Sequence, residues 1–445
     1  MIDPERVKLC RIKRGNTDWW IHEHAVAAQN GKTYIGYVTD TGEVHVKEFD
    51  AKCSRAESRD VCLCRMNNDY SDEHNAPGIC VTESGKILVV YTGHGKDHAV
   101  RLRITERPFD IMSFGAEQRL HYEGGEDARG GVTYVQLFEN TARHELWLFC
   151  RVDKVNWEFR YSSDEGTSWS KPRRFLHSED GGLFYFDTRK MLVKSKEGPV
   201  EQWVFALYGH PRISGDHTIR SGIFRADGQL LKTDGTETAL NLYDPDGPLL
   251  SLPALDTVYA APEGETVRLL DVAPTPPLRI AFAPFKLTDE SAPDPSIPTY
   301  YSATFRDGAW RISKPICKAG EFLSDHILDG SQTYLPGMAY YWGVGEAGLH
   351  KNSASAETST NRIFIARFDG NDHVLESYRS KDRGETYELE QVIRRIPGKN
   401  GLKIWRPIVP LFAQDNLPVY WHEGAYASHS GGWHCDTILP VEYDD

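Results

Sequence analysis

Two histidines lie on either side of one predicted strand. His74 belongs to the polar segment Asp72–Pro77, and His94 follows it by 20 residues, after the apolar run Ile87–Tyr91. One histidine therefore precedes a predicted hairpin and the other follows it, so both side chains can reach the same end of a sheet. Imidazole takes up or releases a proton near neutral pH, so the pair indicates a site for acid–base chemistry. The alternative is that each histidine only hydrogen-bonds a loop.

A tyrosine and an arginine follow on the next predicted hairpin. Tyr134 lies near the start of one strand and Arg151 at the end of the next. A phenol can donate or accept a proton, and a guanidinium can bind a carboxylate through two hydrogen bonds. Histidine, tyrosine and arginine together suit β-elimination at a uronic acid, which needs a base, an acid for the leaving oxygen and a cation for the carboxylate. The alternative is that Tyr134 and Arg151 are ordinary sheet residues.

Composition and charge exclude several classes of protein. Of the 445 residues, 40% are hydrophobic and 26% are charged, which is typical of a folded chain with a substantial core. The net charge of −13 repels nucleic acid and anionic membrane surfaces, so we expect neither as a partner. The start of the chain, Met1–Arg6, has no apolar stretch of signal-peptide type. The compartment stays open between the cytoplasm and export with a signal already removed.

Short β-rich runs recur along the whole chain and are separated by turn dipeptides such as Asn30-Gly31 and Asp369-Gly370. A repeat of about 64 residues is reasonable for a propeller blade with long loops, so the pattern predicts an all-β, seven-bladed β-propeller. The seven runs are Thr33–Val38, Lys86–Tyr91, His144–Phe149, Gln202–Leu207, Leu278–Phe282, Arg362–Ala366 and Pro418–Trp421.

Two further segments share an Asp-box pattern. Ser162–Trp169 and Ser380–Tyr387 both fit S-x-D-x-G-x-[ST]-[WY], and each follows a β-rich run. The pattern predicts a hairpin turn in which the aspartate accepts backbone N–H groups and the glycine takes a positive φ. We expect these boxes to lie on the outside of their blades and assign them no catalytic role.

Taken together, these motifs resemble the BNR-repeat polysaccharide lyases, which include the ulvan lyases and the L-rhamnose-α-1,4-D-glucuronate lyases. The resemblance implies one propeller domain over residues 19–440, after an N-terminal extension of residues 1–18. The motifs that carry it follow one another in order: Glu73–Pro77, Tyr91–His94, Tyr134, Arg151, the first Asp box, Leu207–Pro211, Lys232–Gly235, Trp405–Pro407 and Tyr420–Tyr426.

The resemblance also implies roles for individual residues. His94 and Tyr134 would transfer protons, Arg151 would neutralise the uronate carboxylate, and His74 with Asn75 would shape the same site. The expected substrate is a uronic-acid-containing polysaccharide or oligosaccharide, cut at a rhamnose-α-1,4-glucuronate bond by a monomer that needs no cofactor for catalysis. The resemblance permits a structural metal ion, calcium or zinc, near the propeller axis. Further candidates for binding the acidic sugar are Arg189, His210, Arg220 and Arg406.

Two other functions share this fold. A propeller glycosidase of the sialidase or rhamnosidase kind stays open, although a sialidase-like site would need an arginine triad and an acid or a Tyr–Glu nucleophile pair, which the sequence does not place. A non-catalytic carbohydrate-binding propeller would explain the aromatic residues but not the grouping of histidine, tyrosine and arginine.

Overall fold

The computed structural model describes residues 7–17, 25–28, 30–50, 58–66, 71–122, 131–178, 181–196, 198–211, 214–273, 275–286, 298–324, 334–341, 362–411, 419–428 and 432–442. Within these ranges the chain is almost entirely β-strand and contains no α-helix. None of its helical turns is long or apolar enough to cross a membrane. The 3₁₀ helices are η2 (Glu73–Asn75), η3 (Ile111–Ser113), η4 (Leu252–Ala254) and η5 (Gly398–Asn400).

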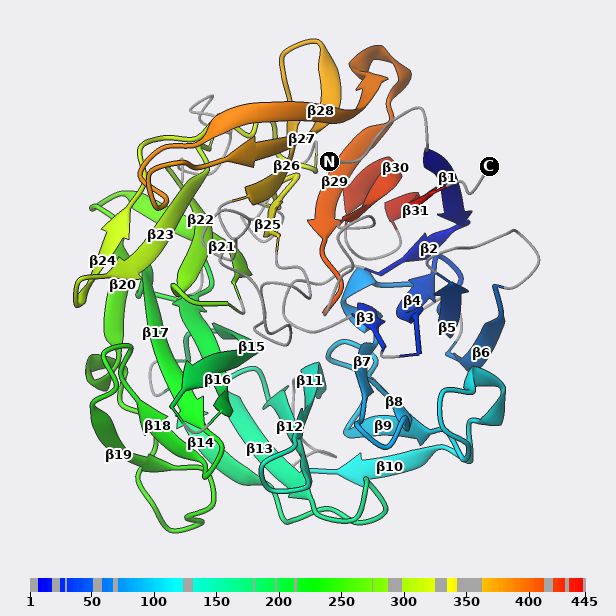
Figure 1. Ribbon diagram of the computed structural model, residues 1–445, viewed down its shortest axis with the longest axis vertical. Helices are drawn as coiled ribbons and strands as arrows, with labels where there is room; N and C mark the ends of the chain where they lie inside the picture. The colour runs from blue at the N-terminus through cyan, green and yellow to red at the C-terminus, as the bar shows by residue number, and fades with distance from the viewer. Residues whose placement is uncertain are drawn as a thin grey trace.

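The strands form seven antiparallel sheets around one centre, a seven-bladed β-propeller (Figure 1). The first blade contains β2 (Gly15–Asn16), β3 (Ala25–Ala27), β4 (Lys32–Thr39), β5 (Glu43–Asp50) and β6 (Asp60–Arg65). The second contains β7 (Gly78–Val81), β8 (Ile87–Tyr91), β9 (Ala99–Ile104) and β10 (Gln118–His121). The third contains β11 (Val132–Asn140), β12 (Glu145–Val152), β13 (Asn156–Ser162) and β14 (Arg173–His177).

The remaining blades follow in chain order. The fourth contains β15 (Phe184–Ser195), β16 (Gly198–Gly209), β17 (Thr218–Arg225), β18 (Gln229–Leu231), β19 (Glu237–Asn241) and β20 (Asp256–Ala260). The fifth contains β21 (Glu265–Val272), β22 (Arg279–Lys286), β23 (Tyr301–Arg306) and β24 (Ala309–Ile312). The sixth contains β25 (Met338–Tyr340), β26 (Arg362–Phe368), β27 (Asp372–Arg379) and β28 (Glu388–Pro397). The seventh contains β29 (Lys403–Ile408), β30 (Tyr420–Ser428), β31 (Gly432–Glu442) and β1 (Val7–Ile12).

The two ends of the chain meet in the seventh blade. Strand β1 pairs antiparallel with β31, from Val7 opposite Glu442 to Ile12 opposite Thr437. The N-terminal extension expected over residues 1–18 is therefore wrong for this strand, because β1 is the edge strand of the seventh blade and pairs with β31. The expected boundary between residues 18 and 19 lies outside the described residues.

Apolar side chains fill the space between neighbouring blades. All five residues of β8 are buried, which explains why Ile87–Tyr91 is apolar throughout instead of alternating: both faces of the strand are covered. Between the third and fourth blades the rings of Trp147 and Trp203 lie 4.3 Å apart, and both side chains are fully buried. Such packing fixes each blade against the next and gives the centre a rigid frame.

Both Asp boxes form the expected turns. The Asp164 carboxylate accepts the Ser168 amide at 2.8 Å between β13 and β14, and Gly166 has a φ of +90°. Asp382 accepts the Thr386 amide at 2.9 Å between β27 and β28, and Gly384 has a φ of +87°. These turns join the outer strands of the third and sixth blades, so they stabilise the fold away from the centre.

Candidate active site

A short turn before β7 organises the centre of the molecule. Asp72 caps the 3₁₀ helix η2 and accepts the His74 amide at 3.0 Å, because a short carboxylate readily bonds the backbone two residues on. Asn75, at the end of η2, accepts the His94 amide through its Oδ1 at 2.7 Å. Since β7 and β8 pair antiparallel, these contacts bring both histidines to one end of the second blade. The expected convergence of His74 and His94 is confirmed.

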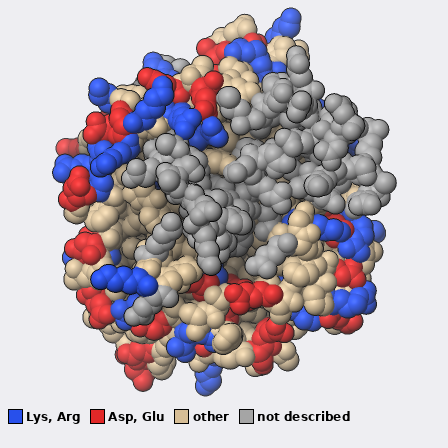
Figure 2. Space-filling view, in the orientation of Figure 1, with Lys and Arg blue, Asp and Glu red and all other residues tan. Residues whose placement is uncertain are grey.

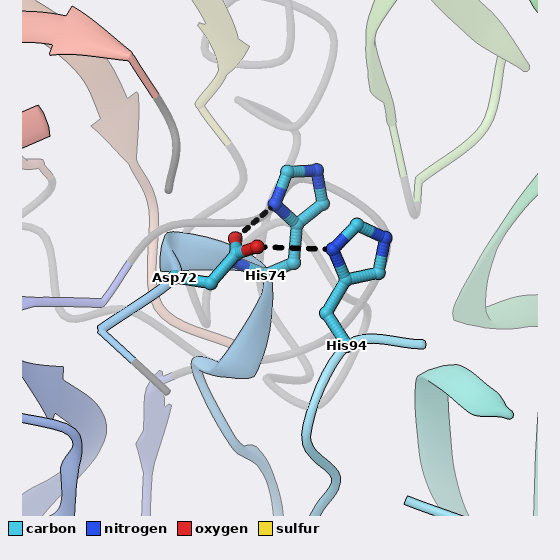
Figure 3. A group of neighbouring side chains, drawn as sticks. All are labelled: Asp72, His74 and His94. Carbon is cyan, nitrogen blue, oxygen red and sulfur yellow. Dashed lines mark hydrogen bonds and ion pairs between the residues drawn. The ribbon is translucent and has the colours of Figure 1, made fainter. Parts of the chain in front are cut away.

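The two histidines share one carboxylate (Figure 3). Nδ1 of His74 lies 2.5 Å from Oδ1 of Asp72, and Nδ1 of His94 lies 3.1 Å from Oδ2. The rings stack with centroids 4.2 Å apart and an interplanar angle of 10°. Burial alone would raise the pKa of the Asp72 carboxyl, but the two histidines together bring it well below its usual range. Because an ionised carboxylate only accepts hydrogen bonds, both Nδ1 atoms carry hydrogens, and proton exchange falls to the Nε2 atoms.

The pair is asymmetric in its exposure. The side chain of His74 is 1% exposed, whereas that of His94 is 24% exposed. His94 is therefore the member of the pair that solvent and substrate can reach.

Tyr134 is directed toward the histidines by a β-bulge. In the β11–β12 pairing Thr133 lies opposite Arg151, but Gln136 lies opposite Phe149, so β11 holds one extra residue. Tyr134 occupies the bulge with a φ of +56°, a region that non-glycine residues adopt at an energetic cost and often at functional sites. Its ring centroid lies 5.8 Å from that of His94 and 5.9 Å from that of His74.

Arg151 packs on Tyr134 from the end of β12. Its guanidinium carbon lies 4.3 Å from the Tyr134 ring centroid and 5.7 Å from that of Tyr185. The residue is only 4% exposed, and its Nε and Nη1 atoms have no hydrogen-bond partner among the described residues. A buried cation of this kind can bind an anionic group that enters the site.

The phenol of Tyr134 is held in its protonated form. Burial raises its pKa well above the usual value, and the nearby Tyr185 adds to this, while Arg151 opposes it. On its own, the neighbouring guanidinium of Arg151 would lower this pKa. Instead the desolvation of a fully enclosed phenol outweighs the attraction of one guanidinium. Tyr134 is therefore suited to donate a proton.

The other predicted sugar-binding residues divide into two groups. His210, just after β16, is buried and stacks on Tyr185 at 5.9 Å, and Tyr185 lies 5.7 Å from Tyr134. His210 is thus joined to the histidine pair through aromatic contacts. Arg189 is buried in ion pairs with Asp187 and Asp271, and Arg220 forms an ion pair with Asp216. Carboxylates of the protein itself therefore engage both arginines.

Two residues of this centre were not recognised from the sequence. Tyr334 is buried between the guanidinium groups of Arg268 and Arg406, which lie 5.0 and 5.1 Å from its ring centroid. Glu73 is fully buried and accepts hydrogen bonds from Tyr426 at 2.7 Å and from Arg406 at 3.4 Å. The signal for Glu73 was its place inside the polar segment 72–77. Tyr334 precedes a three-residue strand and carries no pattern of its own.

A metal ion remains an expectation only. Asp72, His74 and His94 hold potential ligand atoms within 4.8 Å of one another, the one such group found among the described residues. Hydrogen bonds account fully for this arrangement, since both Nδ1 atoms face the carboxylate. We assign no ion to the group.

Comparison with known proteins supports the resemblance in repeat family and in fold. A model of the BNR_4 family, described as a BNR repeat-containing family member, matches residues 32–204. No curated protein matches the chain in sequence.

Several solved polysaccharide lyases share the fold of this chain. An ulvan lyase of family PL25, solved bound to -[GlcA(1-4)Rha3S]-, superposes with a TM-score of 0.67 at 13% identity, over 98% of this chain and 96% of that one. Another structure of a PL25 ulvan lyase gives a TM-score of 0.61 at 13% identity and the same coverage. The polysaccharide lyase Uly1 gives 0.52 at 12% identity, over 95% of this chain and 90% of that one. The expected similarity to this class of propeller is confirmed.

Proposed function

We propose that the protein is a polysaccharide lyase that cleaves a rhamnose-α-1,4-glucuronate bond by β-elimination. One product fragment begins with a 4,5-unsaturated uronate at its new non-reducing end, and the other ends in rhamnose at its new reducing end. The site residues are His94 as base, Tyr134 as acid and Arg151 as the partner of the carboxylate.

The observation that carries this proposal is that the charged side chain of Arg151 is buried without an anionic partner among the described residues. The guanidinium is buried beside the proposed acid, and two of its nitrogens lack hydrogen-bond partners among the described residues. Burial of a cation without an anionic partner is costly, so such a residue is expected where a ligand supplies the anion. In a uronate the carboxylate is attached to C5, the carbon that loses its proton. A cation there stabilises the charge that develops in the transition state more than the charge of bound substrate.

The neighbouring rings of His94 and Tyr134 can carry out the two proton transfers of the reaction. Nε2 of His94 removes the C5 proton, the electron pair forms the C4–C5 double bond, and the C4–O bond breaks. Tyr134 gives its proton to the departing oxygen and then recovers one from His94 or from water. In glucuronate the C5 proton and the C4 oxygen lie on the same side of the sugar ring. Two groups with centroids 5.8 Å apart can serve such a syn elimination.

The charges around the centre suit an acidic glycan although the chain is acidic overall. On the face shown in Figure 2, basic and acidic side chains are interspersed around the described rim. Three buried arginines, by contrast, come from three different blades: Arg151, Arg268 and Arg406. They share the centre with the carboxylates of Asp72 and Glu73, and Glu73 pairs with Arg406. Arg151, which forms no such pair among the described residues, can therefore act on a bound carboxylate in a low-dielectric environment.

The choice of glucuronate and rhamnose as the two sugars is supported by the PL25 ulvan lyase that was solved bound to -[GlcA(1-4)Rha3S]- and shares this fold. The first experiment is therefore a screen of purified protein against acidic polysaccharides, including ulvan and other rhamnosyl-glucuronate glycans. Elimination creates a conjugated double bond that absorbs in the far ultraviolet, and we expect this absorbance to rise. New reducing ends without absorbance would indicate a glycosidase, and binding without cleavage would indicate a carbohydrate-binding propeller. Either result would contradict the proposal.

A further inference from the structure

Gln136 joins the strand that carries Tyr134 to the next blade. It directly follows the bulge of β11, and its side chain is fully buried. Its side-chain amide donates to the Phe186 carbonyl at 2.7 Å and accepts the Thr188 amide at 2.9 Å. Both partners are backbone groups of β15, so a side chain of the third blade is hydrogen-bonded to the main chain of the fourth.

These two hydrogen bonds stand in for a neighbouring strand at the inner edge of β15. Among the described strands, β15 pairs with β16 alone and lies at the end of its sheet, toward the centre of the molecule (Figure 1). The carbonyl of one strand residue and the amide two residues further on point to the same side, where a neighbouring strand would bond them. Gln136 offers one donor and one acceptor at that spacing, so it satisfies both groups without a further strand.

The bulge is also held at its other end. The amide of Val132, two residues before Tyr134, donates to the Asp97 carbonyl at 2.7 Å, in the loop that carries His94. The strained backbone of Tyr134 therefore lies between one contact with the second blade and one with the fourth. Strain of this kind persists only where the surroundings over-determine the conformation, and Gln136 supplies the contact with the fourth blade.

We infer that Gln136 is a positioning residue that directs Tyr134 toward the histidine pair. Its two hydrogen bonds fix the end of the bulge against β15, the strand that also carries Tyr185, whose ring centroid lies 5.7 Å from that of Tyr134. Without these bonds the bulge can relax toward regular pairing, and a shift of one residue moves a side chain to the opposite face of its sheet. The inference deepens the proposed function and rests on it for the role of Tyr134 as acid.

The test compares Gln136→Met with Asn140→Leu. Both changes keep most of the volume of the side chain and remove its hydrogen bonds. Asn140 is a matched control, because it lies at the far end of the same strand, is also fully buried, and donates its side-chain amide to the Ala226 carbonyl of the fourth blade at 2.8 Å. Gln136→Glu is a second variant, since a protonated carboxyl keeps one donor and one acceptor whereas an ionised one only accepts.

The first measurement is NMR and needs no turnover. Each protein is labelled with ¹³C in its tyrosine rings, and the Tyr134 signals are identified by their absence in Tyr134→Phe. We expect these signals to shift in Gln136→Met, because the ring leaves its place beside Arg151 and His94, and to stay in place in Asn140→Leu. In Gln136→Glu they should return toward the wild-type position as the pH is lowered and the new carboxyl takes up a proton. Unchanged Tyr134 signals in folded Gln136→Met, or in Gln136→Glu after its carboxyl has ionised, would overturn the inference.

The second measurement is turnover on two substrates, a rhamnosyl-glucuronate glycan and a glucuronide with a nitrophenyl group on its 4-oxygen, which leaves without an acid. In Gln136→Met, kcat should fall about tenfold or more on the glycan, with KM within about twofold, and change less than about twofold on the nitrophenyl substrate. Asn140→Leu should keep the wild-type kcat on both. Equal losses on both substrates in Gln136→Met would indicate a structural role and overturn the inference. A wild type without lyase activity would refute the proposed function, and the NMR comparison would still test Gln136.

Discussion

Replacing Arg151 by methionine should separate catalysis from stability. Methionine keeps much of the length and apolar volume of the side chain and removes the charge. Arg151 is 4% exposed with two nitrogens lacking partners in the described residues, so burying its charge costs several kcal/mol in the free protein. Packing on Tyr134 and Tyr185 returns about 1–2 kcal/mol for each ring. The free energy of unfolding of Arg151→Met should therefore stay level or rise by about 1 kcal/mol.

The turnover of Arg151→Met, by contrast, should fall. Loss of one preorganised electrostatic partner of the developing charge costs on the order of 10²–10³ in kcat. The rate is measured from the absorbance of the unsaturated product, and stability from urea unfolding. Arg160→Met is the control, since Arg160 is also buried and packs on Tyr122 at 4.2 Å, away from the histidine pair. It should keep turnover within about twofold and lose about 1 kcal/mol of stability. Unchanged turnover in Arg151→Met would show that Arg151 does not bind the reacting carboxylate. A greater loss of stability than in Arg160→Met would show that its buried charge is not costly.

Three further predictions concern single residues. His94→Gln should lower kcat on the order of 10²-fold or more. The circular dichroism spectrum should stay unchanged, because the ring is partly exposed. A folded variant with normal turnover would exclude His94 as the base. Tyr134→Phe should lose a similar factor on glycans but much less on a glucuronide with a nitrophenyl group on its 4-oxygen, since that leaving group needs no acid; equal losses on both substrates would contradict the role as acid. Burial, and then the charge of Arg406, lower the pKa of His422 to about 3. Below about pH 6.5 the unfolded chain therefore binds a proton at this residue that the folded protein does not bind. The free energy of unfolding consequently falls as the pH falls from about 6.5 to 3. Between pH 7 and pH 5 this residue should lower the free energy of unfolding by about 2 kcal/mol. In urea unfolding, the decrease over this pH range should therefore be smaller in His422→Gln than in the wild type by that amount. An equal decrease in both proteins would exclude the effect.

Much of the fold follows from local patterns in the sequence. Seven β-rich runs and two Asp boxes suffice to predict the blades, because strand periodicity and turn chemistry are local properties. The convergence of His74 and His94 also follows, since one residue precedes and the other follows a single hairpin. Tyr134 and Arg151 meet for the same reason on the next blade.

Features that depend on contacts between distant segments could not be predicted. The pairing of β1 with β31 joins residues more than 400 positions apart, and nothing in Val7–Ile12 marks its partner. The bulges that turn Tyr134 and Arg406 toward the centre insert one residue into a strand, which a pattern of alternation does not reveal. Tyr334 reaches His74 across 260 residues of sequence, and its flanking arginines come from two different blades.

The direction in which the pKa of Tyr134 is shifted could not be predicted from the sequence either. The sequence indicates a neighbouring arginine, which favours the phenolate, but the extent of burial depends on the whole fold. Burial is the larger effect here, so the assignment of Tyr134 as acid comes from the structure.

In the proposed reaction this site breaks a C4–O bond by removing the C5 proton. The most direct test is proton NMR of the products formed from a rhamnosyl-α-1,4-glucuronate oligosaccharide, with His94→Gln as the inactive control. We expect a vinylic C4 proton on a new non-reducing uronate, together with a fragment lighter by one water than the hydrolysis product. A saturated uronate of full mass at that end, formed by the wild type and lost in the variant, would contradict the proposed reaction.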